Sequence, residues 1–163
     1  MCGVSADDPA EPTDRDIEDQ LRARSPEAWT DLWEAMGRVD HLLDAGGELT
    51  IDHPRRDNGD GTFTFAFVAS SAELMGLLSA IDEAGLVVPF DWMTWLEVNG
   101  LPEAGALHRR PVSDAVRALT AVVRGDRFAE GAFVDAVLDG TVGLALERIR
   151  QFVESGDQPP ADL

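Results

Sequence analysis

A long stripe of apolar residues between positions 26 and 43 restricts how this chain can fold. Its large apolar side chains recur every three or four residues, at Trp29, Leu32, Trp33, Met36, Val39, Leu42 and Leu43. This spacing places them on one side of an α-helix. Ser25-Pro26-Glu27 is typical of a helix start, and Gly46-Gly47 predicts the end of the helix. The sequence therefore predicts a long amphipathic helix that packs against a core.

Two segments with alternating residues follow the stripe. Glu48–Asp52 alternates apolar and polar residues, and every second residue from Phe63 to Phe67 within Thr62–Val68 is a phenylalanine. Such alternation predicts strands that are buried on one face. The glycine-containing segment Asn58–Gly61 is typical of a turn, so the two segments predict an antiparallel β-hairpin with a long loop. We expect the phenylalanines to lie on its buried face.

Helical spacing dominates the rest of the chain. Helices are expected over residues 71–84, 91–98, 113–123, 128–138 and 142–153. Leu86–Phe90 is expected to form either a third strand or an extended connector. The predicted fold class is α+β, with a mainly helical single domain over residues 25–155 that contains a small antiparallel β-hairpin or three-stranded sheet.

Both ends of the chain have the composition of solvated segments. Residues 1–24 are rich in acids and prolines and carry few large apolar side chains. We expect an acidic disordered tail there, with a short helix over Ile17–Arg24 as the alternative. Residues 156–163 contain Pro159 and Pro160, which disfavour a helix, and are expected to form a flexible C-terminal tail.

Charge excludes several classes of function. The 163 residues carry 31 acids and 13 basic side chains, a net charge of -18, and every basic residue is an arginine. Direct binding to DNA, RNA or an anionic membrane is therefore disfavoured. The absence of lysine removes P-loop and Schiff-base chemistry. The sequence has one cysteine and no recognisable signal peptide or long apolar run, so we expect a cytoplasmic protein without an internal disulfide.

Three segments carry a family resemblance. They are Phe90–Trp95, with the pattern Phe-Asp-Trp-x-x-Trp; Val123–Gly131, with Arg-x-Asp-Arg-Phe-x-Glu-Gly; and Gly140 followed by Leu146–Ile149. Together they resemble a bacterial family known as domain of unknown function 6508, over residues 29–152. The resemblance implies one compact domain and gives no activity, cofactor or catalytic residue.

The first candidate site is the charged segment Arg124, Asp126, Arg127 and Glu130, which interrupts an apolar stretch. Two guanidinium groups at a helix junction can bind a carboxylate or phosphate, with Asp126 or Glu130 as base or orienting group. The structural alternative, which the sequence favours, is that Asp126 caps a helix beginning at Arg127 while the arginines connect helix ends.

The second candidate site is Asp91 with Trp92 and Trp95. Two tryptophans three residues apart, next to an acid, can enclose a planar or cationic ligand. Core packing with Asp91 as a helix cap is the more frequent role of such a pair. If the two candidate sites met in space, they would form a pocket for a small ligand.

No metal site and no cofactor are expected. The three histidines, His41, His53 and His108, lack a second histidine at ligand spacing, and the acids near His53 do not follow the order of a calcium loop. No serine lies in a Gly-x-Ser-x-Gly motif. Cys2 resembles the nucleophile of glutamine amidotransferases, but an acidic, proline-containing segment follows it instead of a buried strand.

Three classes of function remain after these exclusions. The favoured one is a non-enzymatic protein that binds another protein, with a basic protein as the partner that the acidic surface suits. The second is a small-ligand binder or enzyme that uses the two candidate sites together. The third is a nucleic-acid mimic whose carboxylates occupy a DNA-binding partner.

Overall fold

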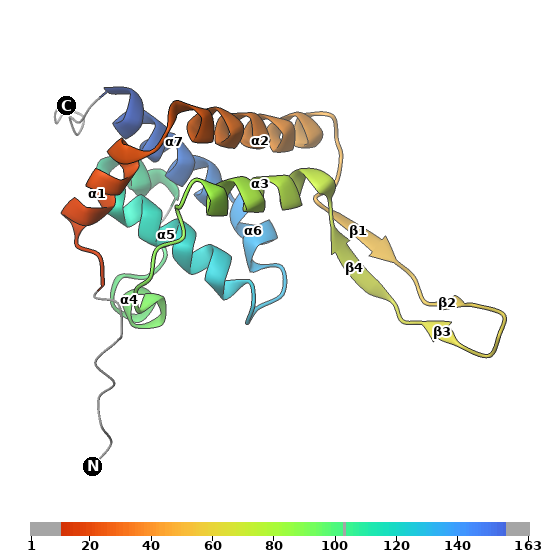
Figure 1. Ribbon diagram of the computed structural model, residues 1–163. Coiled ribbons are helices and arrows are strands. Elements are labelled where there is room, and N and C mark those ends of the chain that lie inside the picture. Colours follow the sequence, from red (N-terminus) through yellow and green to blue (C-terminus); the bar gives the residue numbers. More distant parts are fainter. Residues whose placement is uncertain (1–10, 103, 156–163) are drawn as a thin grey trace, which may run out of the picture. The chain divides into compact units, whose positions relative to one another are not determined.

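The computed structural model describes residues 11–102 and 104–155 (Figure 1). Within these residues the chain forms seven α-helices, one 3-10 helix and four short strands, which confirms a mainly helical α+β fold. None of these helices is long and apolar enough to cross a membrane. Contacts divide the chain into two compact units, Ser25–Ala84 and the segments on either side of it. The single domain predicted over residues 25–155 stays a prediction.

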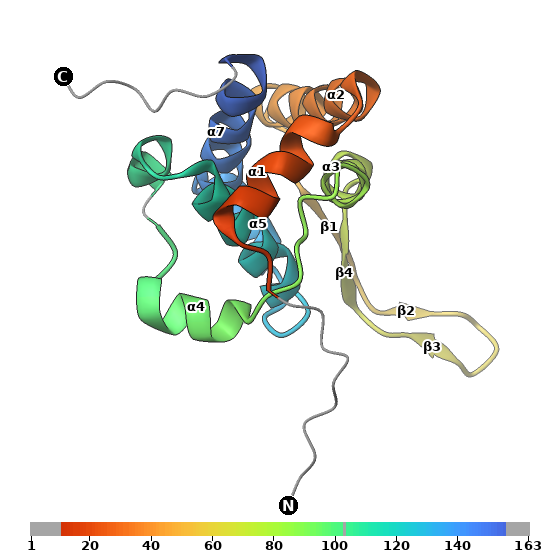
Figure 2. The same ribbon diagram turned by 60° about the vertical axis from the view of Figure 1, so that its left-hand side comes forward.

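The unit Ser25–Ala84 consists of two helices joined by a β-hairpin. Its elements are α2 (Pro26–Asp44), β1 (Thr50–His53), β2 (Arg56–Asp57), β3 (Phe63–Thr64), β4 (Phe67–Ser70) and α3 (Ala72–Glu83). Helices α2 and α3 pack side by side, and the hairpin extends beyond their ends (Figure 1, Figure 2). The long helix and the antiparallel hairpin predicted from the sequence are therefore confirmed.

Caps and apolar spacing explain the two helices. Ser25 accepts a hydrogen bond from the N–H of Ala28, with Pro26 as the first helical residue. Ser71 accepts one from the N–H of Leu74 at 3.2 Å. The apolar side chains buried on α2 and α3 are Trp29, Leu32, Ala35, Val39, Leu74, Leu77, Ala80 and Ile81.

The hairpin is a long ribbon of two strands, and we call Thr50–Ser70 the arm. Strand β1 pairs antiparallel with β4, and β2 pairs antiparallel with β3. Pro54 follows β1 and has no N–H for the ladder, which is why the pairing is interrupted there. The arm therefore contains two successive two-stranded sheets instead of one continuous sheet.

The other unit is built around helix α5. Its elements are α1 (Asp14–Ala23), α4 (Trp92–Asn99), the 3-10 helix η1 (Ala104–Arg109), α5 (Val112–Gly125), α6 (Ala132–Leu138) and α7 (Thr141–Ser155). Helix α5 contacts α1, α4, α6 and α7 (Figure 2). Its fourteen residues include nine buried ones, as expected for a helix with neighbours on most sides.

Helix α1 lies inside the segment that the sequence predicts to be a disordered tail. Thr13 begins the helix with a capping box, and the side chains of Ile17 and Leu21 are buried. The disordered tail is therefore wrong for Asp14–Ala23, and the alternative of a short helix over Ile17–Arg24 is confirmed with an earlier start, because two apolar residues one turn apart let the helix pack. Residues 1–10 and the predicted C-terminal tail, residues 156–163, lie outside the described residues.

Leu86–Phe90 is an extended connector and not a third strand. Its backbone bonds to a side chain of α5 instead of to a sheet. The N–H of Val88 donates to Thr120 Oγ1 at 3.1 Å, and the carbonyl oxygen of Leu86 lies 3.1 Å from the same hydroxyl. This buried hydroxyl therefore replaces the strand partner that the connector lacks.

Candidate functional site

The arm exposes much of the apolar surface of this chain. Of the eleven large apolar side chains exposed among the described residues, the five on the arm are Ile51, Phe63, Phe65, Phe67 and Val68. Phe65 is 80% exposed, and Phe63 and Phe67 are about half exposed. The prediction that the phenylalanines are buried is therefore wrong. A ribbon of two strands needs a further layer to cover either of its faces.

The three phenylalanines share one face of the arm. Directly opposite residues of an antiparallel pair lie on the same face, and here His53 pairs with Phe67 and Asp57 with Phe63. The register is the same in both ladders, and Arg55 and Phe65 occupy corresponding positions of the unpaired stretch between them, so the alternation assigns both to this side. We call this side the aromatic face; it consists of Ile51, His53, Arg55, Asp57, Phe63, Phe65 and Phe67.

Two polar side chains lie against rings of the aromatic face. The imidazole of His53 stacks on the ring of Phe67, with centroids 4.5 Å apart and an interplanar angle of 12°. The guanidinium carbon of Arg55 lies 4.2 Å from the centroid of Phe63. An exposed cation–π contact contributes about 0.5–1 kcal/mol. These contacts hold two rings in place on either side of Phe65.

Hydrogen bonds order the tip of the arm. Asp57 accepts one from the N–H of Gly59 at 2.8 Å, and Asp60 accepts one from the N–H of Thr62 at 2.9 Å. Gly59 has a φ of +79°, a conformation that favours glycine. The Thr62 hydroxyl also donates to Asp60 and lowers the pKa of that carboxyl. The arm therefore ends in a defined turn.

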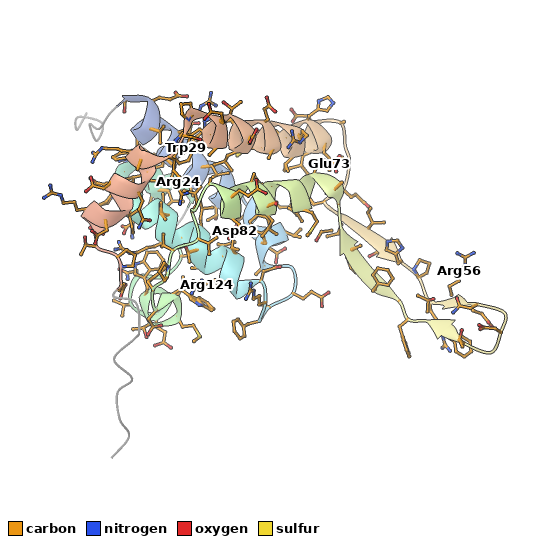
Figure 3. All side chains as sticks on the ribbon, viewed as in Figure 1. Arg24, Trp29, Arg56, Glu73, Asp82 and Arg124 are labelled. Carbon is orange, nitrogen blue, oxygen red and sulfur yellow. The ribbon has the colours of Figure 1, made fainter. Side chains whose placement is uncertain are left out.

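Hollows occur on the arm and on the helices next to it. One of about 880 Å³ lies along the arm, with Arg55, Arg56 and Phe67 among its lining residues. Arg56 belongs to the outer half of the arm (Figure 3). Another of about 580 Å³ lies on α2 and the first turn of α3, where its lining includes His41 and Glu73. The aromatic face therefore lies on an element that also carries a concave surface.

The structure places Asp91 as the N-cap of α4. Its carboxylate accepts hydrogen bonds from the Thr94 N–H at 3.1 Å and from the Thr94 hydroxyl at 2.8 Å. The bond from the hydroxyl, followed by the bond from the N–H, lowers the pKa of Asp91 below its ordinary value. This geometry matches the capping alternative of the sequence analysis.

The two tryptophans of this segment have different surroundings. The ring of Trp95 meets that of Phe90 edge to face, with centroids 6.0 Å apart. The ring of Trp92 lies 5.9 Å from that of Phe128 and borders Gly125, where a Cβ would lie 3.9 Å from it. Both tryptophans remain partly exposed. The structure thus brings Trp92 to the charged segment, as the second functional hypothesis requires.

The other charged residues of this segment are Arg124, Arg127 and Glu130. Within the part of the chain that the structure describes, the side chains of Arg124, Arg127 and Glu130 make no hydrogen bond or ion pair. Arg124 is partly buried, whereas Arg127 and Glu130 are exposed. The alternative in which the arginines connect helix ends is therefore wrong for the described residues.

Asp126 does bind the start of a helix, but a later one than predicted. Its carboxylate accepts a hydrogen bond from the N–H of Phe133 at 3.0 Å. Helix α5 continues to Gly125, and α6 begins at Ala132 after a turn. The predicted helix start at Arg127 is wrong because the chain first needs a turn between two short helices. Asp126 thereby serves a structural role between α5 and α6.

The described residues contain no group of three or more His, Cys, Asp or Glu side chains that could hold a metal ion. Cys2, the remaining residue considered for catalysis, lies outside the described residues.

The aromatic face is the feature that sequence reasoning missed as a site. The alternation of phenylalanines correctly indicates that they share a face, but the interpretation assigned that face to the core. One feature could have marked it as an interaction surface: Gly61–Ala72 contains twelve residues without a charge, a composition that favours burial, whereas 27% of the whole chain is charged. A single predicted hairpin offers no other strand to cover such a segment.

Comparison with known proteins gives a family and no function. No characterised protein and no solved structure matches this chain. The model of a protein family described as a family of unknown function (DUF6508) matches residues 24–155. The match begins at the end of α1 and includes the arm, the Trp92 segment and the Arg124 segment. The chain therefore belongs to family DUF6508.

Proposed function

We propose that this protein acts by binding another protein, with the aromatic face of the arm as the contact surface. The observation that carries the proposal is the exposure of Phe65 and its neighbours on a ribbon of only two strands. Contiguous exposed apolar surface marks interaction sites, and buried aromatic side chains supply much of the binding energy at protein interfaces. The proposed function is non-enzymatic.

The charge outside the arm favours a basic partner for the remaining surface. Of the 31 acids and 13 arginines, 28 acids and 11 arginines lie outside the arm. Such a surface attracts a basic protein by electrostatic steering, and this attraction weakens as salt rises above the physiological concentration. A cytoplasmic location belongs to the same proposal, since a chain with one cysteine suits a reducing compartment.

Photo-crosslinking in producing cells tests the contact surface. A photoreactive phenylalanine derivative replaces Phe65 in one variant and Met75 in the matched control; Met75 is 55% exposed on α3. We expect a discrete cross-linked protein only from position 65. Because the contact is apolar, the same product should also form in a lysate whose salt is raised before irradiation, whereas a partner bound through the acids dissociates before it can be cross-linked. Equal products from both positions, or none from position 65, would contradict the proposal.

A second candidate function is a small-ligand site between Trp92 and Arg124. It is supported by the contact between Trp92 and Phe128 and by the unpaired side chains of Arg124 and Arg127 in the described chain. An aromatic ring beside guanidinium groups suits an aromatic anion.

Titration with the fluorescent anion anilinonaphthalene sulfonate tests this site. Arg127→Ala should weaken binding of the probe without lowering the melting temperature. Arg15→Ala is the control, because Arg15 is an exposed arginine of α1. If the two variants bind the probe equally, the candidate fails.

A further inference from the structure

We infer that a second copy of this chain covers the aromatic face. The inference rests on the proposed function and names the occupant of the same surface. Its first support is charge. Within the aromatic face Arg55 and Asp57 cancel, whereas the residues outside the arm carry 28 acids against 11 arginines. The face is therefore a neutral surface on which two copies of an acidic protein can meet, because its one acid, Asp57, is matched by Arg55.

The second support is that the face is complementary to itself. Two arms can stack face to face and antiparallel about a two-fold axis at the level of Arg56. The register of the arm then places Arg55 of each copy opposite Asp57 of the second copy. It also places Phe65 of each copy over Phe63 of the second copy. A symmetric dimer requires such reciprocal contacts, and the aromatic face supplies one ionic and one aromatic pair of this kind.

The antiparallel arrangement also limits repulsion between the two acidic chains. A strand rises about 3.3 Å per residue, so a two-fold axis at residue 56 separates the two arm bases at residue 50 by roughly 40 Å. The Debye length at physiological salt is about 8 Å. The charges at the two bases are therefore screened from each other while the neutral faces are in contact.

The small size of the face favours a weak, reversible contact. Residues 53 to 59 of each copy, which this axis brings opposite one another, span roughly 20 Å along the strand, and the ribbon is about 10 Å wide. The contact is thus smaller than the 1,200–2,000 Å² of total buried surface that is typical of stable interfaces, about half of it from each copy. We expect a reversible dimer with a Kd in the micromolar range or weaker.

Sedimentation of the purified full-length chain tests the inference, over concentrations from about 1 µM to about 500 µM. The weight-average mass should rise from monomer toward dimer with concentration. Phe65→Asp should keep the chain monomeric throughout, because it buries a charge in the contact. Met75→Asp, an equally charged change on exposed α3, should leave the dimer unchanged. Loss of the dimer in both variants would overturn the assignment to the aromatic face.

Two charge-reversal variants show whether a loss of the dimer comes from a broken contact between the two copies or from a disturbed arm within one copy. R55D and D57R should each dimerise more weakly than the natural chain, because each places like charges opposite one another. An equimolar mixture of the two variants should recover the dimer as a heterodimer, since both ionic contacts then join opposite charges. If the mixture is no more dimeric than either variant alone, the antiparallel pairing is wrong.

Sedimentation and cross-linking together separate the inferred dimer from the proposed function. If the natural chain stays monomeric up to the highest concentration but position 65 cross-links to a different protein in cells, the second copy is excluded and the proposed function stands. If position 65 cross-links to nothing and the chain stays monomeric, both fail. A concentration-dependent dimer that is lost in Phe65→Asp and recovered by the charge-reversal mixture supports the inference.

Discussion

The phenylalanines of the arm and those of the helices around α5 have opposite surroundings. Phe133 on α6 and Phe152 on α7 are 1% and 2% exposed, whereas Phe65 is 80% exposed. Both regions place apolar residues on one face with the period of their secondary structure. The helices have neighbours in their own unit to cover that face, while the arm is only two strands wide along its length. The spacing of apolar residues thus defines a face, and the number of neighbouring elements decides whether the chain itself covers it.

The contrast between buried and exposed phenylalanines predicts the largest loss of stability for a substitution of Phe133. Phe133→Ala removes a fully buried ring and leaves a cavity, so the free energy of unfolding should fall by about 3–5 kcal/mol. Urea denaturation followed by circular dichroism measures the change. Phe128→Ala is the matched control, since Phe128 is 78% exposed in the same unit. An equal loss in both variants would remove the distinction between covered and uncovered rings.

A smaller effect is expected where a buried side chain bonds the connector. Thr120→Val keeps the shape of the side chain but leaves the N–H of Val88 and the carbonyl of Leu86 without their hydroxyl partner. The free energy of unfolding should fall by about 1–3 kcal/mol. Thr30→Val, which removes an exposed hydroxyl bond on α2, should change it far less. If the two losses are similar, burial of the polar contact is not what stabilises the connector.

The docking of α1 should depend on pH. Arg117 donates to Asp14 at 2.6 Å, and this bond lowers the pKa of Asp14 below its ordinary value of 3.8. The contribution is therefore fully present above that value and is lost as the pH falls through the lowered pKa. Because Asp14 is largely exposed, it should amount to less than about 1 kcal/mol. The unfolding free energies of the natural chain and of Asp14→Asn, measured from pH 6 to pH 2.5, should converge at the acidic end. Curves that stay parallel would exclude this ion pair as a source of stability.

The smallest effect on stability is expected on the arm. Phe65→Ala removes a ring that the described chain does not bury, so the free energy of unfolding should change by no more than about 0.5 kcal/mol. The same urea titration that measures Phe133→Ala provides the value. A loss of unfolding free energy close to that of Phe133→Ala would mean that the same chain covers the arm. The contrast between Phe65 and Phe133 would then be wrong.

Features that depend on local residue spacing could be predicted from the sequence, whereas features that depend on long-range contacts could not. Helix α2, the hairpin and the shared face of the phenylalanines follow from residues close together in the chain. Exposure of that face depends on which other elements reach it, and no local pattern encodes this. The sequence predicts helix α1 only as the alternative of a short helix over Ile17–Arg24, because acids dominate the composition there, although Ile17 and Leu21 provide the spacing of a packed helix.

In the candidate site near Trp92, too, local features could be predicted and long-range contacts could not. The cap at Asp91 is a local feature and follows from the sequence. The contact between Trp92 and Phe128 joins distant segments, so the sequence could only state it as a condition. The role of Asp126 was misplaced because its hydrogen bond reaches Phe133, past the turn that the local pattern did not reveal.

The charge-free segment Gly61–Ala72 has a consequence for the concentrated protein. It includes β4, which pairs with β1 along one edge and leaves its other edge open. An uncharged, β-prone segment without proline on an open edge is a template for cross-β stacking and fibrils. The net charge of -18 opposes such assembly by keeping molecules apart at neutral pH. Colloidal stability is therefore lowest near the isoelectric point of about 4.2, where protonated carboxyl groups no longer provide this protection.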